Sequence, residues 1–276
     1  MSDVRPDPTG LSDHERVSAP PACSLSRRQV SEAATRRDHR TRLTLAGLVL
    51  VAATWTEAAP AHSGTPAIVA PTQKLATLLT AHEVFSKPAR NSTPLGRVQA
   101  RRPLTEERTV LPVLGKGAIG ADGLEWLHVR LPGRPNGRTG WIRRRETVAS
   151  TTSWHIVVDI SRRGVVVYRS GRPVRIVKAV VGKPSTPTPR GEFFVEEAIQ
   201  LRPADVGAPF ALALSARSNV LQEFDGGPGQ TALHGLTNVG GVLGSAVSHG
   251  CVRLDNGTMR WLVARIGPGV PVTITG

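Results

Sequence analysis

Short apolar segments separated by glycine and proline occupy most of the chain after residue 84, and this pattern limits its fold more than any other feature. The 276 residues include 28 Gly and 22 Pro, which favour turns and loops over long helices. Apolar residues make up 39% of the chain, close to the share in ordinary globular proteins, so a packed core is expected. We therefore expect a mostly-β protein, and a helical bundle, a coiled coil and a collagen are excluded.

The first 61 residues differ from the rest of the chain. Residues 1–42 are polar and mixed in charge, without the apolar periodicity that a core needs, which is typical of a disordered region. A group of arginines and a short apolar run over residues 43–55 follow, and the A-x-A pattern that ends at Ala61 resembles a signal cleavage site. The run is shorter than the roughly 20 residues of a membrane-spanning helix. We expect export to the cell wall or periplasmic space, with an uncleaved membrane anchor over residues 43–59 or a buried core helix as the alternatives.

The net charge of +14 lies almost entirely after residue 61. A basic surface attracts polyanions of several kinds, including nucleic acid, anionic lipid and acidic wall polymers. Export would separate the protein from nucleic acid, so we expect anionic cell wall polymers as partners and no nucleic acid. Membrane contact is expected only through the N-terminal apolar run.

Two folded parts are expected after this region. Residues 62–80 are rich in Ala, Thr and Pro and are interpreted as a linker. From 81 to 148, short segments alternate apolar and polar side chains, as in Trp126 to Leu131. Five or so such segments, with a G-W-I strand at 140–142, resemble a small SH3-like β-barrel, which we expect over residues 81–148.

The second part, over residues 153–275, also reads as mostly β. The β-branched runs 156–160 and 165–168 are joined by a short polar turn, which predicts a hairpin. Further strands are predicted at 174–181, 192–195, 210–214, 231–234 and 270–274, and a helical spacing is convincing only over Thr258 to Ile266.

Three side chains able to do chemistry lie in the last quarter of the chain: His234, His249 and Cys251. An imidazole that takes a thiol proton makes cysteine a nucleophile at neutral pH, as covalent acyl transfer requires. Gly250 lets the backbone approach a substrate carbonyl and turn its N–H groups toward a developing oxyanion. The only other cysteine is Cys23, so neither a disulfide framework nor an all-cysteine zinc site can form. A chemically inert buried Cys251 and a zinc site built from the three side chains remain as alternatives.

The same region resembles a known family. His234-Gly235, followed after thirteen residues by Ser248-His249-Gly250-Cys251-Val252-Arg253-Leu254, is similar to the signature of the YkuD-type L,D-transpeptidase catalytic domain. Upstream, the segment 186–193 resembles the T-P-x-G-x-F segment of that family. The resemblance covers about residues 153–275 and implies a β-sandwich catalytic domain with one short helix.

The resemblance also implies an activity. A cysteine thiolate would attack the carbonyl between the third and fourth residues of a peptidoglycan stem tetrapeptide, D-Ala would leave, and a second stem's amine would form a 3→3 cross-link. His234 would be the general base, oriented by the carbonyl of Gly235. The implied catalytic residues are Cys251, His234, His249, Gly235 and Gly250, and the implied substrate-binding residues are Ser248 and Arg253.

No cofactor and no metal are expected for this chemistry. Two other functions remain open at this point. One is an L,D-carboxypeptidase, in which water replaces the acceptor amine. The other is a non-catalytic wall-binding protein that only recognises stem peptides.

Overall fold

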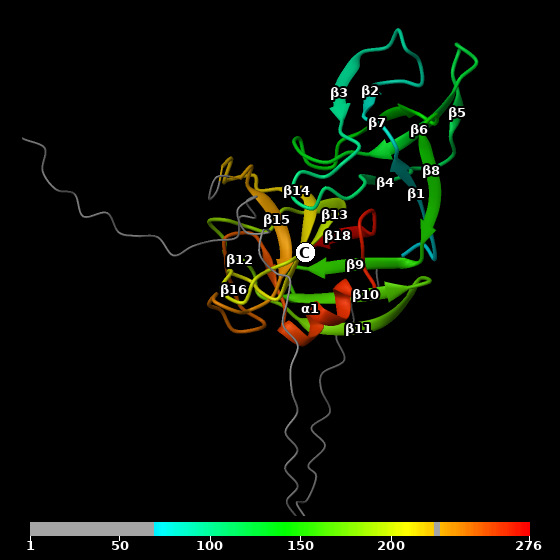
Figure 1. Ribbon diagram of the computed structural model, residues 1–276. Coiled ribbons are helices and arrows are strands. Elements are labelled where there is room, and N and C mark those ends of the chain that lie inside the picture. Colours follow the sequence, from blue (N-terminus) through cyan, green and yellow to red (C-terminus); the bar gives the residue numbers. More distant parts are fainter. Residues whose placement is uncertain (1–68, 224–226) are drawn as a thin grey trace, which may run out of the picture.

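The computed structural model describes residues 69–223 and 227–276, and most of the regular structure in these residues is β-strand (Figure 1). Strands from residues 73–152 gather on one side of the molecule, and those from residues 154–275, with a helix, form the other side. The expected mostly-β chain with one short helix is confirmed for the described residues. The predicted disordered region and signal-like run, residues 1–61, lie outside them.

The first group of strands forms two sheets. The bounds are β1 (Gln73–Leu78), β2 (His82–Phe85), β3 (Pro94–Val98), β4 (Val110–Pro112), β5 (Ala118–Ile119), β6 (Glu125–Arg130), β7 (Thr139–Arg143) and β8 (Thr147–Thr152). The sheets have the orders β4-β1-β8 and β3-β2-β7-β6-β5. Their apolar side chains share a core that includes Leu78, Leu111, Val129 and Ile142. The predicted short strands are present, and the assignment to an SH3-like barrel stays a prediction.

The predicted linker over residues 62–80 is wrong for its second half, because β1 lies there. This strand is the centre of its sheet and pairs antiparallel with β4 on one side and β8 on the other. The Ala and Thr content of the segment resembles a linker, but pairing along both edges overrides a weak local preference. β8 also carries the first group of strands past residue 148, the predicted end of the module.

The second group of strands forms one large sheet and one small one. The bounds are β9 (Trp154–Asp159), β10 (Gly164–Arg169), β11 (Arg172–Lys178), β12 (Val181–Gly182), β13 (Gly191–Gln200), β14 (Phe210–Arg217), β15 (Gln230–His234), β16 (Ala246–Ser248), β17 (Val252–Arg253) and β18 (Pro271–Thr275). The large sheet has the order β11-β10-β9-β18-β13-β14-β15-β17, and β12 pairs with β16. β9 and β10 pair with Val158 opposite Val165, which confirms the predicted hairpin.

The helix α1 (Asn256–Val263) packs its apolar face into the core of this second group. Met259 and Leu262 are fully buried there, as expected from their helical spacing. The helix begins slightly earlier than predicted, because the Asp255 side chain caps it by accepting a hydrogen bond from the backbone N–H of Thr258 at 2.8 Å. Among the described residues, no helix is both long enough and apolar enough to cross a bilayer.

The two groups of strands pack directly against each other. Phe194 of β13 belongs to the core of the first group. The buried carboxylate of Glu196, also on β13, forms ion pairs with Arg102 of the first group and with Arg217 of β14. Apolar packing and buried charge therefore join the two groups at β13.

Candidate active site

Two short strands at one end of the large sheet bring the predicted reactive residues together. β15 ends at His234, and β17 begins directly after Cys251. The strands pair in parallel with His234 opposite Arg253. Side chains alternate between the faces of a strand, so Cys251 and Arg253 point to the same face, which is also the face of His234. The predicted imidazole therefore ends one strand and the predicted thiol directly precedes the neighbouring strand, on one face of the sheet.

The His234 ring is buried and held by the backbone. The residue is 2% exposed, and its Nδ1 lies 2.8 Å from the carbonyl oxygen of Gly235. Because a carbonyl can only accept a hydrogen bond, Nδ1 carries the proton and Nε2 is left as an acceptor. Burial lowers the pKa of His234 to about 4, and the hydrogen bond to Gly235 opposes this shift only in part. The imidazole is thus neutral at pH 7.

Two glycines allow close packing around His234: Gly207 lies against its ring, and Gly235, whose carbonyl orients the ring, lies against the backbone of Ala208. A Cβ on Gly207 would lie 2.4 Å from Nδ1 of His234, and a Cβ on Gly235 would lie 2.1 Å from the carbonyl oxygen of Ala208. The backbone N–H of Gly235 donates to the carbonyl of Gly207 at 2.7 Å. This close backbone packing restricts the orientation of the His234 ring.

A tight turn holds the backbone just before Cys251. The hydroxyl of Ser248 donates to the carbonyl of Cys251 at 2.6 Å and accepts from the N–H of Gly250 at 3.1 Å. Gly250 has a φ of +119°, which residues with a side chain rarely adopt, although a Cβ there would meet nothing closer than 3.5 Å. Backbone conformation, and not lack of space, therefore requires glycine. Ser248 is 0% exposed, so its burial argues for loop support and against the predicted substrate contact.

The segment that resembles T-P-x-G-x-F braces this turn. The hydroxyl of Thr186 donates to the carbonyl of Ser248 at 3.2 Å. The hydroxyl of Thr188 accepts from the N–H of Gly182 at 2.9 Å, and a Cβ on Gly182 would lie 2.4 Å from the backbone nitrogen of Thr188. The segment thus contacts the loop that ends at the thiol.

Basic groups give the site a positive field. Nζ of Lys183 lies 3.4 Å from Nε2 of His249. Burial first, and then the charges of Lys183 and Arg253, lower the pKa of His249. The Arg253 charge also contributes to the lowered pKa of His234, and its Nη1 donates to the carbonyl of Gly240. Such a field favours a thiolate or an oxyanion over new positive charge.

Cys251 is 3% exposed. Nucleophilic chemistry requires the thiolate, so any such chemistry belongs to the reduced form. Cys251 lines a small crevice together with Ser218, Leu221, Gly229 and His249.

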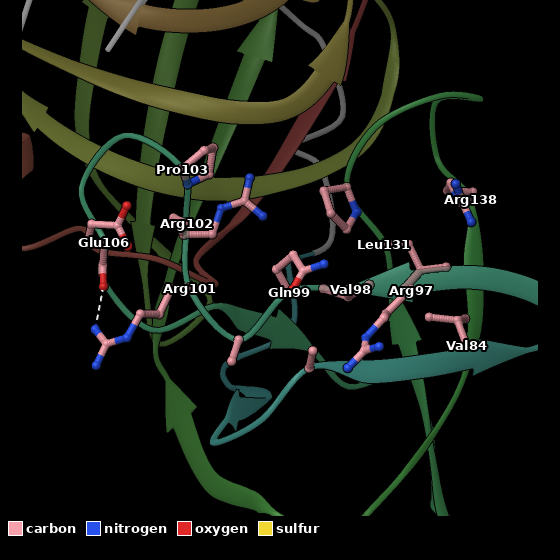
Figure 2. A pocket seen from close by; sticks show the side chains of 13 residues that line it. Val84, Arg97, Val98, Gln99, Arg101, Arg102, Pro103, Glu106, Leu131 and Arg138 are labelled. Carbon is pink, nitrogen blue, oxygen red and sulfur yellow. Dashed lines mark hydrogen bonds between the residues drawn. The ribbon is translucent and has the colours of Figure 1, made fainter.

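A larger hollow lies in the first group of strands, away from these residues (Figure 2). Its volume is about 640 Å³, and four arginines line it: Arg97, Arg101, Arg102 and Arg138. Its lining contains no histidine, cysteine, serine or threonine. Acyl transfer requires a nucleophile and a base, so the reactive groups mark the candidate site better than the size of the void.

A metal site is not assembled in the described part of the chain. Within residues 69–223 and 227–276, no group of three or more His, Cys, Asp or Glu side chains is placed to hold an ion. The alternative zinc site, which would use His234, His249 and Cys251, therefore has no support there.

Several residues that hold the site were not predicted from the sequence. Asn256 is one of them: its amide accepts from the N–H of Leu236 at 2.9 Å and donates to the hydroxyl of Thr237 at 2.8 Å, fixing the chain after Gly235. Lys183 lies three residues before Thr186, where the T-P-T-P segment begins, and this is the one local signal that could have pointed to it. Gly207 has no comparable signal.

Comparison with known proteins agrees on one family. A family model described as YkuD, the L,D-transpeptidase catalytic domain, matches residues 153–274. Two curated relatives, provisionally named L,D-transpeptidase YkuD, come from Bacillus licheniformis and Bacillus subtilis. They are 31% identical over 128 residues and 30% identical over 127 residues, and each alignment covers 45% of this chain and 67% of the relative.

Among solved structures, L,D-transpeptidase 3 from Mycobacterium tuberculosis, in complex with a faropenem-derived adduct, has a TM-score of 0.39 at 15% identity. The match covers 60% of this chain and 91% of that one. An L,D-transpeptidase from Mycobacterium smegmatis has a TM-score of 0.35 at 20% identity, covering 55% of this chain and 92% of that one. The sequence matches, and not these structural likenesses, establish the family.

Proposed function

The chain belongs to the YkuD family of L,D-transpeptidase catalytic domains, and on this basis we propose that it is an exported enzyme that cross-links peptidoglycan stem peptides. The proposed nucleophile is the thiolate of Cys251, and the proposed donor is a stem tetrapeptide that loses its terminal D-Ala. The observation that supports this most is the buried, neutral His234, whose Nε2 has no hydrogen-bond partner among the described residues and shares a sheet face with Cys251.

In the first half-reaction, Nε2 of His234 takes the proton of the reduced Cys251 thiol. The thiolate then attacks the carbonyl carbon between the third stem residue and D-Ala, forming a carbon–sulfur bond. Collapse of the tetrahedral intermediate breaks the carbon–nitrogen bond, and the leaving amine takes the proton from His234. A thiolate beside the ring stabilises the imidazolium, so the pKa of His234 rises while it holds the proton.

Several groups are proposed to stabilise the negative charge of the intermediate. The proposed oxyanion donor is a backbone N–H of the turn that contains Gly250, directly before the reacting thiol. The charges of Lys183 and Arg253 supply the positive field around His249, and the neutral His249 ring is proposed to donate a hydrogen bond to the intermediate. Contact between Arg253 and the stem peptide is part of the proposal.

In the second half-reaction, an amine on the side chain of another stem attacks the thioester carbonyl. The amine passes its proton to Nε2 of His234, the carbon–sulfur bond breaks, and the thiolate is released. The product is the 3→3 cross-link, and no cofactor is needed, because every proton in the cycle passes through His234.

Replacement of the thiol tests this proposal. With reducing agent present, Cys251→Ala and Cys251→Ser should each lower the rate of dimer formation from purified tetrapeptide muropeptides by at least roughly 10³-fold. Products are measured by liquid chromatography and mass spectrometry. Cys23→Ser is the matched control and should keep full activity. Unchanged activity in both Cys251 variants would overturn the proposal.

Two other outcomes can be separated in the same assays. If water replaces the amine, the product is the tripeptide stem without dimer, and the protein is an L,D-carboxypeptidase. If the protein only binds stem peptides, Cys251 should not react with a carbapenem. A live thiolate would attack the strained β-lactam carbonyl, break its carbon–nitrogen bond and leave a thioester adduct that intact-mass spectrometry detects.

Export and the wall environment are also part of the proposal. The positive charge after residue 61 supports association with anionic wall polymers. Cell fractionation with an antibody to residues 153–274 should recover the protein outside the cytosol, in the cell wall or periplasmic fraction. Recovery from the cytosol alone would contradict export.

A further inference from the structure

The turn between β6 and β7 reaches from the first group of strands to the end of β14. The guanidinium of Arg134, in this turn, donates three hydrogen bonds to backbone carbonyls of the second group. One goes from Nη1 to Pro228 at 2.9 Å, and two go from Nη2 to Ser218 at 2.8 Å and Leu221 at 3.0 Å. One planar side chain thereby ties together carbonyls from both ends of the segment between β14 and β15.

Asn136, in the same turn, adds a second attachment. Its Nδ2 donates to the carbonyl of Arg217 at 2.8 Å, and its Oδ1 accepts from the N–H of Arg217 at 2.8 Å. Nδ2 also donates to Oδ1 of Asn219 at 3.1 Å. The amide therefore pairs with the last residue of β14 as a neighbouring strand would.

These hydrogen bonds end on one wall of the crevice that contains Cys251. Ser218, Leu221 and Gly229 line that crevice. Gly229 follows the carbonyl that Arg134 binds at Pro228, and a Cβ on Gly229 would lie 2.0 Å from the carbonyl oxygen of Leu221 and 3.2 Å from Nη2 of Arg134. The wall is thus built closely around the arginine.

From this geometry we infer that Arg134 and Asn136 are positioning residues that fix the crevice wall against which the donor peptide binds. This inference rests on the proposed function. Besides these bonds, the N–H of Ser218 donates to the carbonyl of Gly229 at 2.8 Å, and the hydroxyl of Ser218 accepts from the N–H groups of Val220 and Leu221 at 3.2 and 3.0 Å. Without Arg134, the wall would have to be ordered when the donor binds, and that ordering would weaken binding.

The inference predicts a loss in binding and not in chemistry, because Arg134 contacts neither Cys251 nor His234 in any hydrogen bond of the described residues. We expect Arg134→Ala to raise the carbapenem concentration that gives half-maximal acylation rate by roughly tenfold. The limiting acylation rate constant should stay within about twofold. Both quantities come from the time course of the Cys251 adduct by intact-mass spectrometry at several carbapenem concentrations, with reducing agent present.

A matched control separates this effect from a general weakening of contact between the two groups of strands. Arg130 lies on β6, and its Nη1 donates to the carbonyl of Glu192 on β13 at 3.1 Å, away from the crevice. Arg130→Ala should leave both acylation constants unchanged. Arg134→Lys keeps the charge but loses the planar fork, so its half-maximal concentration should fall between those of wild type and Arg134→Ala.

If Arg134→Ala does not fold, Asn136→Ala still tests the inference. This variant should raise the carbapenem concentration for half-maximal acylation rate by about threefold. The inference would be overturned if the folded variants kept the half-maximal concentration of the wild type, or if Arg130→Ala raised it as much as Arg134→Ala does. In either case, acylation of the wild type would still support the proposed function. A wild type that no carbapenem acylates would overturn both.

Discussion

At the scale of single residues, the buried imidazole of His234 has a measurable cost in stability. Its pKa is lowered to about 4 in the folded protein, from an ordinary value of 6.5. Between these values the unfolded chain binds a proton that the folded protein does not, so the free energy of unfolding falls as pH falls. We expect this residue to remove on the order of 2 kcal/mol of stability between pH 7 and pH 5.

Urea unfolding of the wild type and of His234→Gln at the two pH values measures this cost. Glutamine does not titrate, so the variant should lose less stability than the wild type between pH 7 and pH 5. Other histidines titrate in both proteins, and their contributions cancel in the comparison. Equal losses would show that His234 is not a buried neutral ring.

The residues that perform the proposed chemistry could be predicted from the sequence, but most of those that support them could not. Cys251 and His234 stand in a motif of reactive residue types with glycines beside them. Gly207 and Arg134 act through contacts with segments far away along the chain. Such contacts depend on how strands pair and pack, and a local pattern contains no record of them.

At the scale of elements, the turn before Cys251 depends on one hydroxyl. Ser248→Ala would leave the N–H of Gly250 and the carbonyl of Cys251 without that partner in a buried place. We expect a loss of about 1–3 kcal/mol in the free energy of unfolding. We also expect a roughly tenfold or larger loss in the limiting acylation rate, because the thiol is no longer held in place.

The same loop offers a control for this prediction. The hydroxyl of Ser245 is buried without a hydrogen-bond partner in the described residues, so Ser245→Ala should change stability and acylation little. Thermal unfolding and carbapenem acylation of the two serine variants give the comparison. Similar effects at both positions would mean that the Ser248 hydroxyl has no special part in the turn.

Element by element, strands with β-branched side chains were predictable, and β1 was not. β9 and β10 contain runs of β-branched residues that include Val158 and Val165, so the local pattern already predicts the hairpin. β1 contains Ala and Thr, and its strand conformation comes from β4 and β8 on its two sides. A strand defined by its neighbours has no strong local signal.

At the scale of the whole molecule, buried charges join the two groups of strands. Glu196 and Glu197 of β13 are both buried, and the cations that face them are Arg102 from the first group and Arg217 from β14. Burial lowers the pKa of each of these arginines to about 10, so both stay charged at neutral pH. A buried carboxylate that loses its cation keeps the cost of desolvation and loses the compensating attraction.

Arg102→Ala should therefore lower the free energy of unfolding by about 3 kcal/mol. The control is its neighbour, Arg101→Ala, which should cost less than about 0.5 kcal/mol, because that side chain is exposed and, within residues 69–223 and 227–276, hydrogen-bonds only to the carbonyl of Glu106 (Figure 2). Glu196 belongs to the core strand of the second group, so the loss should spread to both groups. Hydrogen exchange measured by mass spectrometry should then rise in peptides from β6 and from β13 alike. Faster exchange in β6 alone would mean that the first group unfolds independently and that the buried charges do not couple the two halves.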